Sequence, residues 1–327
     1  MGFHENIATD ENARFEGFAR ELTAMQKRPS RALHAKQHVG VAARFDVNGK
    51  GAGLFATPSS YAAYVRFSNG AGGKRSDKTP DARGFAVKVV GVAGKKIIAG
   101  LEDKKTQDFL FITTPSLPFQ TPDEFMSFIR AAVGGPGLLV PRLLVSLGLG
   151  RGLSVLKRLA SSPKLASYAT HPFHTAAPIA WGDTAAKLSL VPSSSSSASS
   201  ASATPAGAAD DPDMFRADLV KRLRAGPLAW SVRAQTFIDD ATTPIEDASV
   251  TWPDDKSPQV EVATLTIPQQ DPESAEGKAL SERIDAMSFD PWHAIEAHRP
   301  LGAVMRARAI AYRDSVIARG ASAEPES

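Results

Sequence analysis

The segment Arg31-Ala32-Leu33-His34-Ala35-Lys36 leads directly into the run Val39-Gly40-Val41-Ala42-Ala43-Arg44-Phe45-Asp46-Val47. The alternation along this run is typical of a strand with one buried face. A single histidine, His34, therefore stands just before the first predicted strand. Its unperturbed pKa lies near neutrality, which suits acid–base chemistry. A lone histidine is more often structural, so a catalytic role for His34 needs support from other parts of the sequence.

Strand-like runs recur on both sides of the middle of the chain. Each alternates or is rich in β-branched and aromatic residues, and each is bounded by Gly, Pro, Asp or Asn. The predicted strands are 38–47, 61–69, 83–92, 106–114, 178–192, 228–239 and 258–267. Strands follow strands without crossover helices, which favours a closed antiparallel β-barrel over a doubly wound sheet. Together with the helical segments described next, this barrel gives an expected fold class of α+β.

Helical patterns flank and interrupt these strands, over 10–27, 121–169, 212–224 and 297–319. The stretch 131–150 is strongly apolar, but prolines and glycines break it, and it is too short to span a bilayer. We interpret 121–169 as a helical insertion packed on the barrel. A weak contact with a membrane or lipid surface through 131–169 stays open as the alternative, because basic residues accompany the leucines there.

The Ser/Ala-rich run at about 193–209 predicts a flexible loop within a single domain that covers residues 1–327. The chain has no cysteine, which excludes disulfides, thiolate-bound zinc, iron–sulfur clusters and thiol catalysis. A net charge of +3 over 327 residues gives no indication of nucleic acid as a partner. No secretory signal is visible at the N-terminus, so we expect a cytoplasmic protein.

The last predicted helix carries polar groups on one face. Arg308 and Tyr312 are four residues apart and Arg319 lies eleven beyond Arg308, so all three return to the same side. Taken alone, this spacing is that of an ordinary amphipathic helix. It becomes informative together with His34 at the other end of the chain.

Together these segments resemble the catalase superfamily, and most closely its small bacterial members, the catalase-related peroxidases. The resemblance covers about residues 25–320. The matching segments are Arg31 to Lys36, Tyr64-Val65-Arg66-Phe67-Ser68-Asn69, Pro80-Asp81-Ala82-Arg83-Gly84-Phe85-Ala86-Val87-Lys88, Thr106-Gln107-Asp108-Phe109-Leu110, Phe289-Asp290-Pro291-Trp292 and Arg308 to Arg319. The resemblance implies a catalase-like, closed, eight-stranded antiparallel barrel with a helical insertion and C-terminal helices.

The resemblance also implies roles on the peroxide side of a bound haem. His34 matches the distal histidine that moves a proton between the two peroxide oxygens, and Ser68 matches the serine that orients it. The distal asparagine of catalases is expected near Ile112-Thr113-Thr114-Pro115, where Thr113 is the nearest polar candidate. Because no asparagine stands there, peroxidase activity is favoured over true catalase activity.

On the opposite side, the resemblance implies a ferric haem b whose iron is bound by Tyr312 as the phenolate. Arg308, one turn earlier, supplies a positive charge that favours this anion. The remaining cofactor-binding residues that we infer are Arg31, Arg66 and Arg319, which match arginines that hold the haem propionates, and Phe67, as barrel core or haem packing.

The activity that these features imply is haem-dependent reduction of hydrogen peroxide or organic hydroperoxides through a ferryl intermediate, with a small organic reductant. Three alternatives stay open: true catalase activity, hydroperoxide rearrangement like that of the catalase-like allene oxide synthases, and a non-catalytic haem carrier. Those synthases carry Thr before the distal histidine, whereas Leu33 stands here. We expect a monomer or a homodimer.

Overall fold

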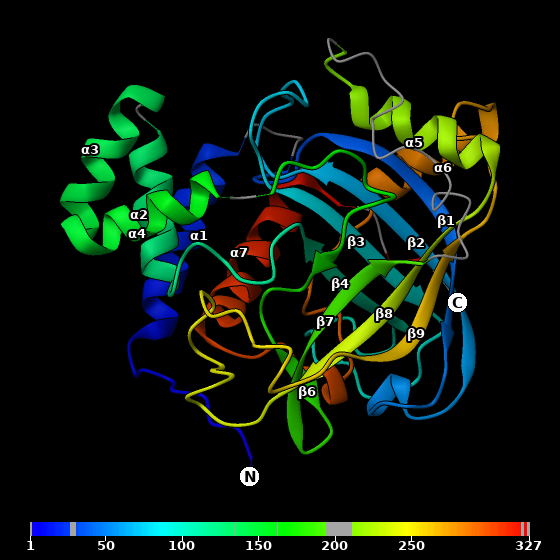
Figure 1. Cartoon of the computed structure of the whole chain (residues 1–327), viewed down its shortest axis with the longest axis horizontal. Helices are drawn as coiled ribbons and strands as arrows, with labels where there is room; N and C mark the ends of the chain where they lie inside the picture. Colours follow the sequence, from blue (N-terminus) through cyan, green and yellow to red (C-terminus); the bar gives the residue numbers. More distant parts are fainter. Residues whose placement is uncertain are drawn as a thin grey trace.

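The computed structural model describes residues 2–26, 31–133, 135–161, 163–193, 211–321 and 324–325. Within these ranges eight antiparallel strands form a ring in the order β5-β4-β3-β2-β1-β9-β8-β7, closed by the β5–β7 pairing (Figure 1). A ninth strand, β6, adds a hairpin to β7. The bounds are β1 Gln37–Val47, β2 Ser59–Asn69, β3 Arg83–Val90, β4 Thr106–Ile112, β5 Phe173–His174, β6 Ile179–Trp181, β7 Thr184–Pro192, β8 Leu228–Thr236 and β9 Val260–Ile267. The predicted closed eight-stranded barrel is confirmed.

Successive side chains of each strand point alternately into and out of the barrel, as the period of two requires. In β2, Val65 and Phe67 lie fully buried in the central apolar core, and the intervening Arg66 faces outward. The ring of Phe67 is 4.5 Å from that of Phe85, which in turn lies 5.1 Å from the ring of Trp230. Aromatic packing thus fills the interior, and polar groups are left on the outer face of β2, β3 and β4.

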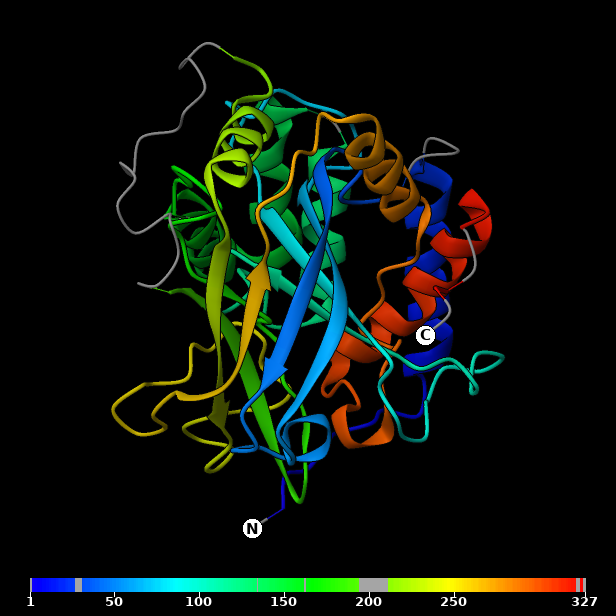
Figure 2. The same cartoon turned by 90° about the vertical axis from the view of Figure 1, so that its right-hand side faces the viewer.

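Helices cover that outer face. The N-terminal helix α1 (Glu11–Met25) packs along the C-terminal helix α7 (Ala303–Arg319), and α6 (Ala275–Ala286) packs on β1 and β2. Figure 2 shows α7 and α1 together on one side of the barrel, with α6 above them. A further helix, α5 (Met214–Ala225), also contacts β1.

The predicted helical insertion consists of α2 (Pro122–Ala132), α3 (Pro136–Leu147) and α4 (Leu149–Ala160). Phe119, Leu143 and Val155 form a small apolar core of its own between these helices. Figure 1 shows α3 and α4 at the outer edge of the molecule, away from the strands. Among the described residues, no helix combines the length and apolar character needed to cross a bilayer.

The structure also contains elements that the sequence patterns did not predict. These are α6, the two-residue strand β5 and the short 3-10 turns Gly53–Phe55 and Glu296–His298. The predicted strand 178–192 is a hairpin instead, because Gly182 turns the chain with a positive φ of 62°. The predicted helix 297–319 begins only at Ala303, after Gly302 with φ 86°. The predicted loop at 193–209 lies outside the described residues except for Ser193.

Candidate active site

His34 is fixed in place just before β1 by its backbone as well as its ring. Its φ of +56° lies in the left-handed region, which a residue with a side chain adopts at a cost of about 1 kcal/mol or more. The His34 N–H donates to the Gly70 carbonyl at 2.8 Å, and the His34 carbonyl accepts from Arg66 Nη2 at 2.9 Å. These two contacts hold the unusual conformation and set the direction of the side chain.

The His34 ring lies against the outer face of β2 and β3. Its Nδ1 is 3.0 Å from Ser68 Oγ, so the expected His34–Ser68 pair is present. Gly84, which pairs with Ser68 across the sheet, makes this approach possible. A Cβ atom at Gly84 would lie 2.6 Å from His34 Nδ1 and 2.9 Å from Ser68 Oγ. Gly84 is therefore part of the site, and a glycine inside a strand is the sequence signal that marks such a close approach.

His34 is set up to be a neutral base. Burial is the largest cause that lowers its pKa to about 3, and the positive charges of Arg66, Arg308 and Arg31 lower it further. The imidazole is therefore uncharged across the physiological range and able to accept a proton. Arg308 is thus the one residue of helix α7 among these charges.

Helix α7 presents Tyr312 and Arg308 as a pair. Arg308 Nη2 donates to Tyr312 Oη at 2.9 Å, and the guanidinium carbon lies 5.1 Å from the centre of the tyrosine ring. The four-residue spacing on one helix face produces this contact, as the sequence predicted. A guanidinium at the hydroxyl stabilises the phenolate relative to the phenol, which is the form that binds ferric iron.

Three arginines from distant parts of the chain converge on the end of α6, and we call Arg31, Arg66 and Arg319 with Asp285 the arginine cluster. Arg31 Nη1 and Arg66 Nη2 are 3.1 and 2.9 Å from Asp285 Oδ1. Their remaining bonds include the carbonyls of residues 285–287, which end the helix: Arg31 Nη2 and Arg319 Nη2 donate to Met287 O at 2.7 and 2.6 Å. Helix C-termini leave such carbonyls without intrahelical partners.

The arginine cluster has more positive than negative charge. Burial lowers the pKa of all three guanidinium groups, that of Arg319 to about 10, and repulsion by Arg66 lowers those of Arg31 and Arg319 further. One carboxylate, Asp285, stands against three cations within the described residues. A set of forked cations with surplus charge fits carboxylate groups of a ligand, and haem propionates are such groups.

Two predicted site residues lie apart from this group. Phe67 is inside the barrel core, on the opposite face of β2 from Arg66 and Ser68, so the alternation of the strand places it behind the wall of the site and not in contact with a cofactor on the outer face. The β4 residue paired with Gly84 is Ile112, one position before Thr113. Thr113 accepts a bond from His171 Nε2 through its carbonyl at 3.3 Å, and no hydrogen bond among the described residues joins its side chain to His34 or Ser68.

A second buried charged group lies further along the outer face of β3, and we call Lys88, Asp108 and Glu324 the lysine cluster. Lys88 Nζ is 2.7 Å from Asp108 Oδ1 and 2.7 Å from Glu324 Oε2. Thr106 Oγ1 also donates to Glu324 Oε2 at 2.7 Å. The two carboxylates raise the pKa of Lys88 despite its burial.

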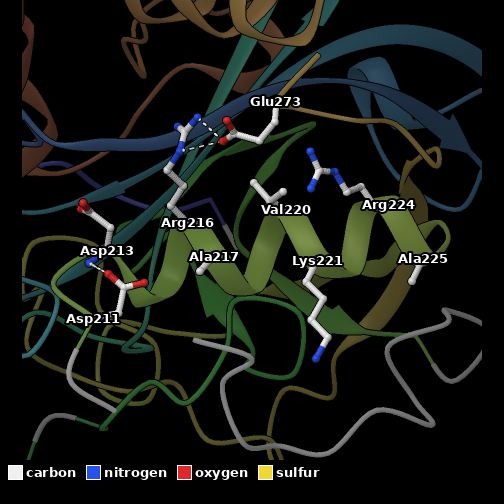
Figure 3. A pocket seen from close by; sticks show the side chains of 9 residues that line it. All are labelled: Asp211, Asp213, Arg216, Ala217, Val220, Lys221, Arg224, Ala225 and Glu273. Carbon is white, nitrogen blue, oxygen red and sulfur yellow. Dashed lines mark hydrogen bonds and ion pairs between the residues drawn. The ribbon is translucent and has the colours of Figure 1, made fainter. Parts of the chain in front are cut away.

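Surface hollows add no second centre of chemistry. One of about 730 Å³ runs along α5, and Figure 3 shows Arg216 turned toward Glu273 while Lys221 points away from them. Arg216 Nη2 and Glu273 Oε1 form an ion pair at 2.6 Å in this hollow. Across the described ranges, no three His, Asp or Glu side chains gather in a way that could hold a bare metal ion.

The sequence is 32% identical over 315 residues to a protein named catalase-related peroxidase from Mycolicibacterium paratuberculosis, and the match covers 90% of this chain and 92% of that protein. The structure is similar to a fungal catalase (TM-score 0.68, 18% identity) and to catalase A from Saccharomyces cerevisiae (0.68, 16%), each covering 98% of this chain. It is also similar to a bacterial catalase (0.66, 18%, 96% of this chain). The chain spans 61–66% of the length of these catalases. No protein-family model matches the sequence.

Proposed function

The chain belongs to the catalase-related peroxidase family, and from that membership we propose that it uses haem to reduce hydrogen peroxide or organic hydroperoxides with electrons from a small organic donor. The observation that carries the proposal is the presence of two pairs, His34 with Ser68 and Arg308 with Tyr312. The first pair is suited to moving a proton on a peroxide. The second is suited to binding an oxidised iron.

The residues present fit a ferric haem b. Tyr312 would bind the iron as the phenolate, supported by the hydrogen bond from Arg308. Arg31, Arg66 and Arg319 would hold the propionates, which supply the negative charge that the arginine cluster lacks. When bound, the haem supplies an iron that splits the O–O bond and keeps the oxidising equivalents until the donor returns two electrons.

His34 then acts as the proton carrier. Its neutral imidazole accepts the proton of the peroxide oxygen nearer the iron and gives it to the outer oxygen, which leaves as water or an alcohol. Ser68 Oγ at Nδ1 keeps the ring in one orientation, so that Nε2 is the nitrogen left for the peroxide. Gly84 provides the space in which the ring lies.

Peroxidase activity is favoured over true catalase activity by the residue beside Gly84. Ile112 occupies the paired position on β4, and its apolar side chain offers no hydrogen bond to orient a second hydrogen peroxide molecule. Leu33 before His34 disfavours a hydroperoxide-rearranging enzyme of the allene oxide synthase kind. A simple haem carrier has no need for an oriented base such as the His34–Ser68 pair.

The experiment compares the haem-loaded protein with its His34→Ala variant, using cumene hydroperoxide and a chromogenic donor. We expect donor oxidation by the parent protein and a loss of about 100-fold or more in the variant, which is the scale of general acid–base groups. The control is His4→Ala, which changes a histidine of the N-terminal arm. Oxygen release from hydrogen peroxide without donor oxidation would instead establish a catalase, and haem loading without any turnover would establish a carrier.

We also propose that the protein is a monomer or a homodimer and that it is cytoplasmic. Sedimentation velocity of the haem-loaded protein tests the first, and a tetramer would contradict it.

A further inference from the structure

The helical insertion exposes an unusual share of apolar surface. Twelve large hydrophobic side chains are exposed among the described residues, and half of them lie within residues 133–153. These six are Val133, Leu138, Val140, Val145, Leu149 and Leu153. Val145 is 87% exposed and Leu149 is 68% exposed. Exposed apolar side chains gathered in this way mark an interaction site.

Four of these six residues, Leu138, Val145, Leu149 and Leu153, lie on a stripe along α3 and α4. In α3, Leu138, Arg142 and Val145 follow the spacing of one helix face, and in α4 Leu149, Leu153 and Lys157 do the same. Behind the stripe, Leu143 and Val155 are fully buried in the small core of the insertion. At the turn between the two helices, Gly148 adopts a φ of 76°, and Val145 and Leu149 flank this turn.

The charge around the stripe has one sign. No Asp or Glu occurs between Glu124 and Asp183, and six basic residues lie in that interval. They are Arg130, Arg142, Arg151, Lys157, Arg158 and Lys164. Arg130 and Arg151 are paired with Glu21 and Glu124. In the described part of the chain, Arg142, Lys157 and Lys164 are exposed and make no ion pair.

We propose that the face of α3 and α4 formed by Leu138, Arg142, Val145, Leu149, Leu153 and Lys157 docks on the surface of an anionic lipid bilayer. Its apolar residues would sit at the level of the lipid headgroups, and its cations would meet the lipid phosphates and carboxylates. Each helix has twelve residues, so the pair lies on the bilayer and does not cross it. A second copy of the chain is a poorer occupant, because two faces of the same sign repel each other.

Docking is independent of the peroxidase proposal, because none of the site residues lies on this face. The probe is a suspension of vesicles made of phosphatidylcholine alone or with three parts in ten of phosphatidylserine, sedimented with the haem-loaded protein. We expect binding to the phosphatidylserine vesicles that weakens with added salt, and little binding to phosphatidylcholine.

Two variants separate the contributions. The double substitution V145S/L149S should lower the partition coefficient at least about 10-fold, because two apolar anchors are lost. R142Q/K157Q should lower it about 25-fold, with each cation contributing about 5-fold. The matched controls I238S/V260S and K50Q/K105Q change exposed residues elsewhere on the chain and should leave binding unchanged.

Circular dichroism and the melting temperature of each variant check the fold. The residues changed in the two test variants and in the two controls are all exposed. Three results would overturn the proposal. They are no binding to phosphatidylserine vesicles at low salt, equal binding to both kinds of vesicle, and dimerisation that V145S/L149S abolishes in a protein that ignores vesicles. The last result would assign the face to a second copy.

Discussion

The arginine cluster and the lysine cluster both lie on the outer face of the barrel, and both combine positive and negative side chains. The lysine cluster is fully buried. The arginine cluster is only partly buried, because the Asp285 side chain is 45% exposed. The two clusters differ in the proportion of positive to negative side chains. In the lysine cluster, Lys88 stands between Asp108 and Glu324, and its pKa is raised. In the arginine cluster, Arg31 and Arg66 pair with Asp285 while Arg319 donates to backbone carbonyls, and the pKa of all three guanidinium groups is lowered.

This difference distinguishes a structural ion group from a binding site. A structural group is complete in itself, so that removing one member leaves an uncompensated buried charge. A binding site has charges that only its ligand neutralises, and these uncompensated charges lower the stability of the protein without ligand. Loss of a cation should therefore lower stability in the lysine cluster, and should lower ligand affinity with little loss of stability in the arginine cluster.

The largest effect is expected from Lys88→Met. The substitution removes the ammonium group that contacts both Asp108 and Glu324, and it should lower the free energy of unfolding by about 3–5 kcal/mol. Urea denaturation of the protein without haem measures this loss. If the triple variant K88M/D108L/E324L recovers most of the stability, the loss comes from the unpaired carboxylates; a single variant as stable as the parent would show that the lysine cluster is not a structural group.

The next effect concerns Asp290, whose backbone N–H donates to Asp108 Oδ2 at 3.0 Å. Burial raises the pKa of Asp290 to about 7 from an unfolded value near 4, so the folded protein holds a proton there that the unfolded chain releases. Stability should therefore fall as pH rises from about 4 to about 7.

Asp290→Asn removes this loss while keeping an acceptor for the Trp292 N–H. At pH 8 the variant should be more stable than the parent by up to about 4 kcal/mol, and at pH 3 the two should be equal. Chemical denaturation at a series of pH values gives the comparison. A constant difference between the two proteins at all pH values would mean that Asp290 does not titrate in this window.

The smallest effect is expected from Arg319→Gln in the arginine cluster. Loss of one propionate donor should weaken haem binding about 10-fold, the scale of one charge-assisted hydrogen bond, and leave the stability of the haem-free protein nearly unchanged. Arg306→Gln on the same helix is the matched control, because Arg306 is paired with Glu5, Glu11 and Glu246. It should lower stability and leave haem affinity intact; the reverse pattern would remove the distinction between the two regions.

Periodicity predicted the parts of the site that lie within one element. The Arg308–Tyr312 contact follows from four-residue helical spacing, and the barrel follows from repeated strand patterns. The same rule also places Phe67, since Arg66 and Ser68 on its two sides face outward and Phe67 must face inward. Of the two roles expected for Phe67, barrel core or haem packing, strand alternation therefore favours the barrel core.

Contacts across long sequence separations could not be predicted in this way. Asp285 joins Arg31 over 254 residues, and it lies on α6, whose weak apolar stripe did not predict a helix. Glu324 reaches Lys88 over 236 residues. Such pairs depend on how the helices pack on the barrel, which local patterns do not contain. The prediction that His34 lies beside Ser68 rested on the resemblance to a family and not on residue spacing.

The proposed function depends on a haem that binds with Tyr312 as its iron ligand. Titration of the haem-free protein with ferric haem, followed by visible absorption, tests it in the parent and in Tyr312→Phe. We predict one haem per chain with a phenolate-ligand spectrum in the parent, and weak binding without that spectrum in the variant, while circular dichroism shows both folded. Full haem loading of Tyr312→Phe with an unchanged spectrum would show that Tyr312 is not the iron ligand.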